Sequence, residues 1–375
     1  MKIAFLMQDT GTVYGAERAT LDLAEGLRGR PGYDVHLLLI QEQRLGLSRS
    51  GLREALAARS LGFTSLPTDR SFSWRLVRAI RGELGNVRAD VLHAVGYKAD
   101  VHGGLAAAWG RRVPVVATVH GWLFRADVKE RFYGWLDLQS LRRFTKVVAL
   151  CRSYEELLVR RGIARERIIR IPSGIDAEKI VSRDRAESSL QKPRPFTAGM
   201  LGRLSEEKNH EMFLRAARCL LDAGCDARFL IAGEGPLRGR LEEKVRRLGL
   251  ERSVQFLGYV DRDDFMEEIH ALVVCSMIES LPYSVMEAMA WFRPVIATRV
   301  GGLPDLVEGV GAGYLVEKND QASLVRCMTE LAGNPDLRHR LGMRARTGLE
   351  QRFSLGTMLD TYVRLYHEIL KDAED

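Results

Sequence analysis

The sequence has few cysteines and no long apolar run. Five cysteines occur among 375 residues, and none belongs to a CxxC pair. This scarcity excludes a disulfide-stapled scaffold and favours reduced, mostly buried thiols, as expected of a cytoplasmic chain. No run reaches the ~18 apolar residues that a membrane-spanning helix needs, and the first apolar stretch is too short for a signal peptide. Any membrane contact is therefore expected to be peripheral. The cysteines are Cys151, Cys219, Cys225, Cys275 and Cys327.

Two common ligand-binding signatures are also missing. No GxGxxG motif follows a predicted strand; the nearest approach, GEGPLRG at 233–239, has its last glycine one place late and a proline inside. The NAD-binding interpretation thereby loses its main support. No histidine or cysteine cluster has zinc spacing. The string DRDD at 261–264 resembles a DxD metal motif, but Asp261 suits a helix N-cap, so we expect no metal and no bound cofactor.

Acidic residues are outnumbered by basic ones, which gives a formal net charge of +7 and a pI near 9.2. This sign favours anionic partners: phosphorylated metabolites, an acidic membrane surface or nucleic acid. Arginines cluster at 159–170, 111–112 and 142–143. Solvated faces are the default interpretation, but with nearby aromatic residues these clusters would also suit a rim on anionic lipid at the inner face of the membrane. No recognition motif supports nucleic acid. The aromatic residues are Trp122, Phe124, Phe132, Tyr133 and Trp135.

Length and apolar pattern predict two α/β domains, since 375 residues exceed one ordinary core. Short runs rich in Val, Ile and Leu alternate with amphipathic segments, which indicates parallel sheets covered on both faces. The predicted strands are KIAFLM, DVHLLLI, GFTSL, DVLHAV, PVVATVH, KVVAL and RIIRIP in the first half, then FTAGML, ARFLIAG, VQFLG, ALVVCS, PVIAT and GYLV. Each half is thus a doubly wound, Rossmann-like sheet.

The polar segment 182–195, which ends in two prolines, predicts the linker between the domains. We therefore place an N-terminal domain at 1–185 and a C-terminal domain at 186–354. The amphipathic helix predicted at 355–375 packs back on the N-terminal domain or on the C-terminal one. Ligands of open α/β sheets bind beyond the carboxyl ends of the strands, so the active site is expected in the cleft that the two domains face.

The stretch SMIESLPYSVMEAMA, 276–290, carries only two charges, Glu279 and Glu287. Glu279 follows a buried strand and precedes Pro282, which suits the first turn of a helix. The amides of that turn, those of Leu281 and Tyr283 among them, would bind an anion, and the two carboxylates would bind hydroxyls of a sugar and a ribose. Alternatively, Glu279 is a helix cap and Glu287 an exposed helix residue.

Two further turns offer groups for a diphosphate. In GMLGRLSEEKNH, 199–210, Arg203 and Lys208 follow a predicted strand. Their two positive charges would neutralise the negative charge of a diphosphate. The alternative is a solvated loop. Near the start of the chain, Gly11 and Gly15 fall in the first strand-to-helix turn, where a backbone can approach a ligand closely.

These motifs and their order resemble the retaining glycosyltransferases of family four, which have the GT-B fold. The resemblance is carried by IPSGID, GRLSEEKN, GEGPL, FLGYV, the E-x7-E pair and GGLPD. It implies that Arg203 and Lys208 hold the donor diphosphate, that Glu279 contacts the transferred sugar and that Glu287 contacts the ribose. It further implies that Gly15 approaches the β-phosphate and that His120 lies near the sugar. The base is expected against Gly258, Tyr259 and Val260.

Four positions depart from the family pattern. Tyr14 stands before Gly15 where two glycines are frequent, so the acceptor pocket is expected to differ. Ser173, Ser280 and Asp305 are mild replacements of an Asn, a Gly and a Glu. None removes a charge that the chemistry needs.

The resemblance implies an enzyme that moves a hexose or N-acetylhexosamine from a UDP- or GDP-sugar to a lipid-linked or saccharide acceptor, with retention and without a metal. Surface polysaccharide or glycolipid assembly is the expected setting. Two alternatives stay open: a nucleotide-sugar epimerase of the same double fold, and a binding protein that senses nucleotide sugars. The base, the sugar, the acceptor, the linkage and the oligomeric state are not specified by the sequence.

Overall fold

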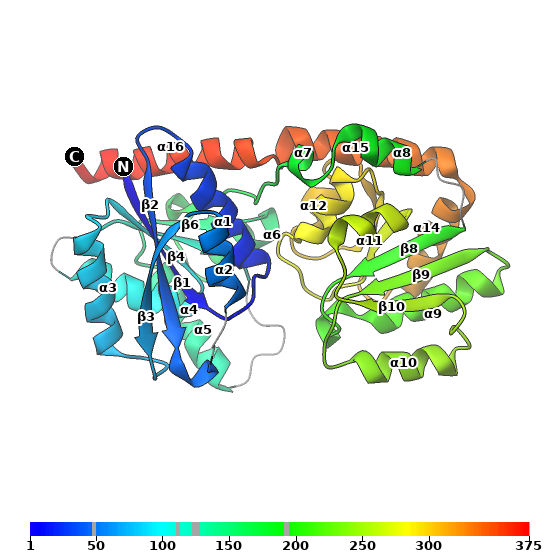
Figure 1. Ribbon diagram of the computed structural model, residues 1–375, viewed down its shortest axis with the longest axis horizontal. Helices are drawn as coiled ribbons and strands as arrows, with labels where there is room; N and C mark the ends of the chain where they lie inside the picture. Colours follow the sequence, from blue (N-terminus) through cyan, green and yellow to red (C-terminus); the bar gives the residue numbers. More distant parts are fainter. Residues whose placement is uncertain (47–49, 110–112, 122–127, 191–194, 375) are drawn as a thin grey trace. The chain divides into compact units, whose positions relative to one another are not determined.

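The computed structural model describes residues 1–46, 50–109, 113–121, 128–190 and 195–374 (Figure 1). The chain forms two compact units. The first comprises Met1–Gly174 together with Leu355–Asp375, and the second comprises Ile175–Ser354. The division falls at Gly174, whereas the sequence placed it at residue 185.

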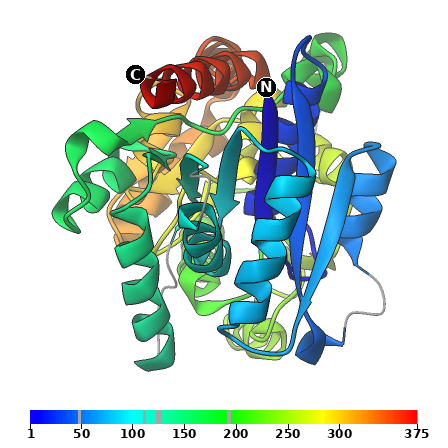
Figure 2. The ribbon, with the colours of Figure 1, turned by 90° about the vertical axis from the view of Figure 1, so that its left-hand side faces the viewer.

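The N-terminal unit is built on a seven-stranded parallel sheet in the order β3-β2-β1-β4-β5-β6-β7 (Figure 2). All seven predicted runs are strands. These strands are continuous apolar runs in the sequence because both faces of the sheet are buried; in β1, five consecutive residues are buried. The strands are β1 (Lys2–Asp9), β2 (Asp34–Glu42), β3 (Gly62–Thr68), β4 (Val91–Val95), β5 (Val115–Val119), β6 (Lys146–Ala149) and β7 (Ile168–Arg170). The helices between them are α1 (Gly15–Arg28), α2 (Gly51–Ala58), α3 (Trp74–Asn86), α4 (Tyr97–Ala108), α5 (Val128–Leu141) and α6 (Arg152–Arg160).

The C-terminal unit contains a six-stranded parallel sheet in the order β10-β9-β8-β11-β12-β13. Its strands are β8 (Phe196–Leu201), β9 (Ala227–Ala232), β10 (Val254–Gly258), β11 (Ala271–Val274), β12 (Val295–Thr298) and β13 (Gly313–Val316). Its main helices are α9 (His210–Asp222), α10 (Arg238–Arg247), α11 (Arg262–Glu268), α12 (Tyr283–Ala290), α13 (Leu303–Val307), α14 (Gln321–Gly333) and α15 (Pro335–Arg352). In each sheet the first strand pairs with the next one on one side and with the fourth on the other. The order of strands reverses there, and ligands of such sheets bind at that point.

The predicted linker at 182–195 is wrong in its first part. A helix, α8 (Arg183–Leu190), lies there, and α7 (Ala177–Ile180) precedes it. Ala186 and Ser189 are buried, and the Ser189 hydroxyl accepts a hydrogen bond from Arg293 Nη2 at 2.6 Å. The buried hydroxyl of Ser189 is satisfied by an arginine, so a polar residue can be buried here. The polar composition therefore indicated a linker, although the segment is a helix that packs within the C-terminal unit. Residues 191–194 lie outside the described chain.

The last helix, α16 (Leu355–Glu374), packs on the N-terminal unit, which decides between the two options that the sequence left open. It lies against α1, where Gly26 leaves room for Leu359; a Cβ on Gly26 would come within 2.5 Å of that side chain. Six of its side chains are buried in the core: Met358, Leu359, Tyr362, Leu365, Tyr366 and Ile369. Among the described helices, none is both long and apolar enough to cross a membrane.

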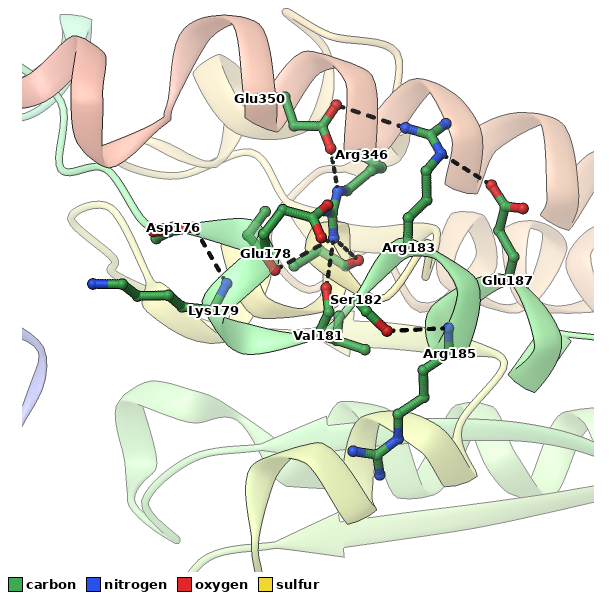
Figure 3. A network of polar contacts seen from close by, with 12 residues as sticks. Asp176, Glu178, Lys179, Val181, Ser182, Arg183, Arg185, Glu187, Arg346 and Glu350 are labelled. Atoms are coloured by element: carbon green, nitrogen blue, oxygen red, sulfur yellow. Dashed lines mark hydrogen bonds and ion pairs between the residues drawn. The ribbon is translucent and has the colours of Figure 1, made fainter.

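One fully buried cation, Arg346 of α15, joins three segments of the C-terminal unit (Figure 3). Its guanidinium donates to the carbonyl of Ala290 at 2.8 Å, at the end of α12, and to the carbonyls of Ala177 and Val181 at 3.5 and 3.4 Å. It also pairs with Glu178 and with Glu350. Five acceptors around one guanidinium compensate its burial, and they fix α12 relative to α7 and α15.

Replacing this cation should destabilise the C-terminal unit strongly. Arg346→Met keeps most of the stem but removes the guanidinium that donates to three carbonyls and pairs with two carboxylates, and we expect a loss of about 3 kcal/mol or more. The control is Arg247→Met, which removes an exposed ion pair with Glu243 and should cost under about 1 kcal/mol. Urea and thermal unfolding compare the two variants; equal losses would contradict the assignment.

Candidate active site

Three loops meet at the carboxyl edge of the C-terminal sheet. They follow β8, β9 and β10, and backbone hydrogen bonds connect them. Gly202 N donates to Ala232 O at 3.0 Å, Leu204 N to Glu234 O at 3.0 Å, and Gly233 N to Gly258 O at 2.7 Å. The GRL, GEGPL and FLGYV motifs therefore form one connected surface.

Glycine is required where these loops touch. A Cβ on Gly233, whose φ is +127°, would lie 2.0 Å from the carbonyl oxygen of Gly202. A Cβ on Gly235 would lie 2.4 Å from the carbonyl oxygen of Leu204. Real Cβ atoms do not approach backbone this closely, so any side chain at either position would push the loops apart.

Glu279 sits in the turn between β11 and α12, as predicted, and three neighbours hold it. Its Oε1 atom accepts from Lys208 Nζ at 2.5 Å and from Ser276 Oγ at 2.8 Å. The backbone on its other side faces Gly301, where a Cβ would lie 1.7 Å from the Glu279 carbonyl oxygen. The side chain is 11% exposed, so the carboxylate is nearly covered while it faces a cation from the GRL loop.

The helix that carries Glu287 starts one residue later than the sequence indicated. Pro282 is the N-cap of α12, with φ −72° and ψ 127°, and the first helical residue is Tyr283. The amide of Leu281 therefore precedes the first turn. The extended ψ of Pro282 causes the difference, because a residue in that conformation flanks a helix rather than belonging to it. The side chains of Leu281 and Tyr283 are both buried.

Glu287 is buried, with 3% of the residue exposed, so the alternative that it is a solvated helix residue is wrong. Arg262, half exposed, donates to its Oε1 atom from 2.8 Å. Arg262 comes from the DRDD string, in which Asp261 caps α11 by accepting from the amides of Asp263 and Asp264. The predicted N-cap is thus confirmed.

The remaining positions predicted for the donor are exposed or lie at loop backbone. Arg203 is exposed, and its guanidinium makes no ion pair with any residue that the structure describes. The stem of Lys208 packs beside Gly202, with Cε 3.6 Å from where a Cβ would be. Gly258 has φ +69°, and Tyr259 beside it is 85% exposed, with Val260 partly buried. An exposed ring at this edge is free to stack on a planar group.

In the N-terminal unit, Gly15 is the first residue of α1 and Tyr14 is its exposed N-cap residue. The glycine that the turn requires is Gly11, which has φ +84° and accepts from the amide of Gly51 at 2.9 Å. Buried Asp9 fixes this turn, because its Oδ1 atom accepts from the Gly11 amide at 3.0 Å and from Ser50 Oγ at 2.6 Å.

His120 follows β5 directly and lines a small cavity together with His93, Thr118, Ser173 and Tyr362. Burial lowers the pKa of His120 to about 4, so the imidazole is neutral at physiological pH. The ring is therefore able to accept a hydrogen bond as well as to donate one.

The predicted basic and aromatic rim is described only in part. Trp122, Phe124 and the pair at 111–112 lie outside the described residues. On α5, Phe132 and Trp135 are about half exposed and stack with their ring centroids 6.1 Å apart. Arginines of the 159–170 run are partly neutralised, since Arg165 and Arg170 both pair with Glu155.

Four residues of these sites were missed from the sequence. Ser276 and Arg262 hold the two glutamates, and Gly301 and Asp9 hold the turns. A glycine doublet in GGLPD was a usable signal for Gly301. The others contact their partners only through the fold, and no spacing in the sequence marks them.

Comparison with known proteins assigns both halves of the chain. The family described as Glycosyltransferase Family 4 matches residues 13–179, and the family described as Glycosyl transferases group 1 matches residues 182–348. The chain is 26% identical over 294 residues to the UDP-Gal:alpha-D-GlcNAc-diphosphoundecaprenol alpha-1,3-galactosyltransferase of Escherichia coli, covering 75% of this chain and 76% of that protein. It is also 26% identical over 352 residues to the alpha-D-kanosaminyltransferase of Streptomyces kanamyceticus, covering 86% and 91%.

The fold is shared with solved structures. HepE of Anabaena, crystallised with UDP, superposes with a TM-score of 0.83 at 22% identity and covers 98% of this chain and 100% of that one. Sucrose-phosphate synthase of Thermosynechococcus elongatus gives a TM-score of 0.80 at 19% identity, with 99% of each chain covered. With two Rossmann-like units, both halves matched and these neighbours, the chain belongs to the family-four glycosyltransferases of GT-B fold.

Proposed function

We propose that this glycosyltransferase moves a hexose or N-acetylhexosamine from a UDP- or GDP-sugar to a lipid-linked or saccharide acceptor, with retention of the anomeric configuration. The observation that carries the proposal is the contact of Glu279 with Lys208 and Ser276 at the carboxyl edge of the C-terminal sheet. It places a cation suited to a diphosphate beside a carboxylate suited to sugar hydroxyls.

The charges suit the bond that must break. Cleavage between the anomeric carbon and the donor phosphate oxygen builds positive charge on the sugar and negative charge on the diphosphate. Lys208 and Arg203 would stabilise the diphosphate, a contribution on the order of 3 kcal/mol per donor. The acceptor hydroxyl would attack the same face of the sugar, and its proton would pass to the departing diphosphate. This route needs neither a protein nucleophile nor a metal.

The other residues bind the donor. Glu287 would accept hydroxyls of the ribose, with Arg262 holding its carboxylate. Tyr259 offers its exposed ring to the base, beside the backbone of Gly258 and Val260. In the N-terminal unit, Gly15 would approach the β-phosphate and the neutral imidazole of His120 would face the sugar.

The names of the relatives and the surface of α5 support the choice of acceptor. The Escherichia coli relative acts, by its name, on a diphosphoundecaprenol-linked sugar. A lipid-linked acceptor would bring the enzyme to the inner face of the membrane, where exposed aromatic rings such as Phe132 and Trp135 suit the headgroup region. Polysaccharide or glycolipid assembly is the corresponding setting.

Donor binding is tested first with UDP, GDP, ADP, CMP and NAD in thermal-shift assays, each with magnesium or EDTA. One nucleotide diphosphate at a hundred times its dissociation constant should add about 2.7 kcal/mol. The matching nucleotide sugar should then yield an acceptor-linked product with EDTA present, and the anomeric proton coupling in NMR should match the donor. An inverted product, or loss of transfer in EDTA, would refute that part of the mechanism. Epimerised sugar without transfer, or binding without turnover, would instead support the two alternative functions.

Glu279→Gln should reduce transfer by about 100-fold or more, because the amide no longer carries the charge that positions the sugar. Nucleotide diphosphate binding should stay within about tenfold, since the change frees Lys208 from its ion pair. Steady-state kinetics and calorimetry measure the two quantities. Glu251→Gln, an exposed change before β10 at the opposite edge of the sheet, is the control. Undiminished turnover of the Glu279 variant would rule out its role.

The double variant Arg203→Gln with Lys208→Gln should lose nucleotide diphosphate affinity by about 100-fold or more, because each charge-assisted contact contributes about 1.5 to 3 kcal/mol. The double variant Arg247→Gln with Arg252→Gln, at two exposed arginines, controls for the loss of two positive charges. Calorimetry at two salt concentrations separates the site from general charge attraction. A double variant that binds as tightly as its parent would remove both residues from the donor site.

A further inference from the structure

Four buried side chains of the N-terminal unit form a hydrogen-bonded chain beside His120. His93 of β4 contacts Tyr366 through Nδ1 at 2.6 Å and Thr118 through Nε2 at 2.8 Å. Thr118 Oγ1 also contacts the hydroxyl of Tyr362 at 3.0 Å. At most 5% of each of these residues is exposed. Two of the four come from α16, more than 240 residues away in sequence.

This hydrogen-bonded network borders the same cavity as His120. Thr118 lies in β5, and His120 is the residue directly after that strand. The two are two positions apart, so their side chains leave the same face of the strand. His93, Thr118, His120 and Tyr362 line one cavity, which Met358 of α16 also borders. The helix that completes the core of this unit therefore also supplies part of the wall around His120.

Both imidazoles are neutral in this environment. Burial lowers the pKa of His93 to about 3, with a smaller contribution from His120, and lowers the pKa of His120 to about 4. Among the residues that line the cavity, His93 and Tyr362 are the other titratable groups; β1, α1 and the loop at Ser173 contribute none. A neutral imidazole has one donor and one acceptor nitrogen, so Thr118 and Tyr366 together fix the orientation of the His93 ring.

A purely apolar core would not need these groups. Burying a hydroxyl or an imidazole is costly unless it is hydrogen-bonded, and replacing both partners of such a bond by apolar groups of the same shape can be nearly neutral. Thr118 lies one residue before the carboxyl end of β5, the edge at which ligands of parallel sheets bind, and His93 in the middle of β4 connects it to Tyr366. This placement favours a role in the site over a role in the core alone.

We propose that Tyr362 and Tyr366 of the C-terminal helix, acting through His93 and Thr118, are positioning residues that hold His120 against the transferred sugar. The inference rests on the proposed function of His120. It makes α16 a part of the active site of the N-terminal unit. Removing one hydroxyl from the chain should loosen the His120 ring and admit water to the cavity.

The test uses the full-length enzyme and the variants Tyr362→Phe and Thr118→Val. We expect kcat to fall tenfold or more while the donor KM stays within twofold. The acid limb of the kcat/KM profile should move upward by about one pH unit, because hydration returns the pKa of His120 towards its ordinary value. Thr118→Ser retains the hydroxyl and should restore both quantities to within twofold of the parent.

Tyr33→Phe, in the loop between α1 and β2, is the matched control because it removes a different tyrosine hydroxyl that contacts α16. Its hydroxyl contacts His367 of α16 at 3.0 Å, but the pair is exposed. The control should leave kcat and the pH profile unchanged. If Tyr362→Phe and Thr118→Val change only the melting temperature, with kcat and the pH profile of the parent, the positioning role is overturned. If the parent enzyme transfers no sugar at all, the proposed function fails instead.

Discussion

The site of the C-terminal unit depends on backbone approaches that only glycine permits. Gly233 and Gly235 let the loop after β9 contact the loop after β8, and Gly301 lets the turn after β12 contact the backbone of Glu279. These contacts support the GRL loop and the turn before α12 from either side, and a hydrogen bond from Met277 N to Glu207 O at 2.7 Å joins the two, so that Lys208 reaches Glu279. The charges of Lys208 and Glu279 are thus positioned with the help of residues that have no side chain.

Helix α12 of this unit is stabilised at both ends by charged side chains that are wholly or partly buried. At the N-terminal end of α12, Ser276 and Lys208 satisfy Glu279; within the helix, Arg262 satisfies Glu287. At the C-terminal end, Phe292 adopts φ +56° with its ring fully buried, and the guanidinium groups of Arg183 and Arg346 lie over it. Such contacts offset the strain of a left-handed backbone at a residue other than glycine. The helix is therefore fixed before any ligand binds.

Much of the fold could be predicted from the sequence because strands of parallel sheets, buried on both faces, are continuous apolar runs. All thirteen predicted strands exist. Glu279 could be located because a strand and a proline bracket it. The burial of Glu287 could not be predicted, since its partner Arg262 is 25 residues away in the sequence. Arg262 lies in the DRDD string, whose aspartates suggested a metal motif or a helix cap instead. The helix at Arg183–Leu190 was missed because arginine partners, not apolar contacts, satisfy its buried hydroxyl. The amphipathic pattern of α16 indicated that it packs but not on which unit.

The position of α16 has a consequence for the order in which the protein folds as it is made. The N-terminal unit takes six core side chains from residues 358–369, whereas the C-terminal unit is complete at Ser354. The N-terminal unit must therefore wait, with the cavity beside His120 lacking one wall, until residues 358–369 have also been synthesised. The later half can close its own core beforehand. A chain released before α16 is made would carry a finished C-terminal unit and an N-terminal sheet whose apolar face stays open to aggregation or to chaperones.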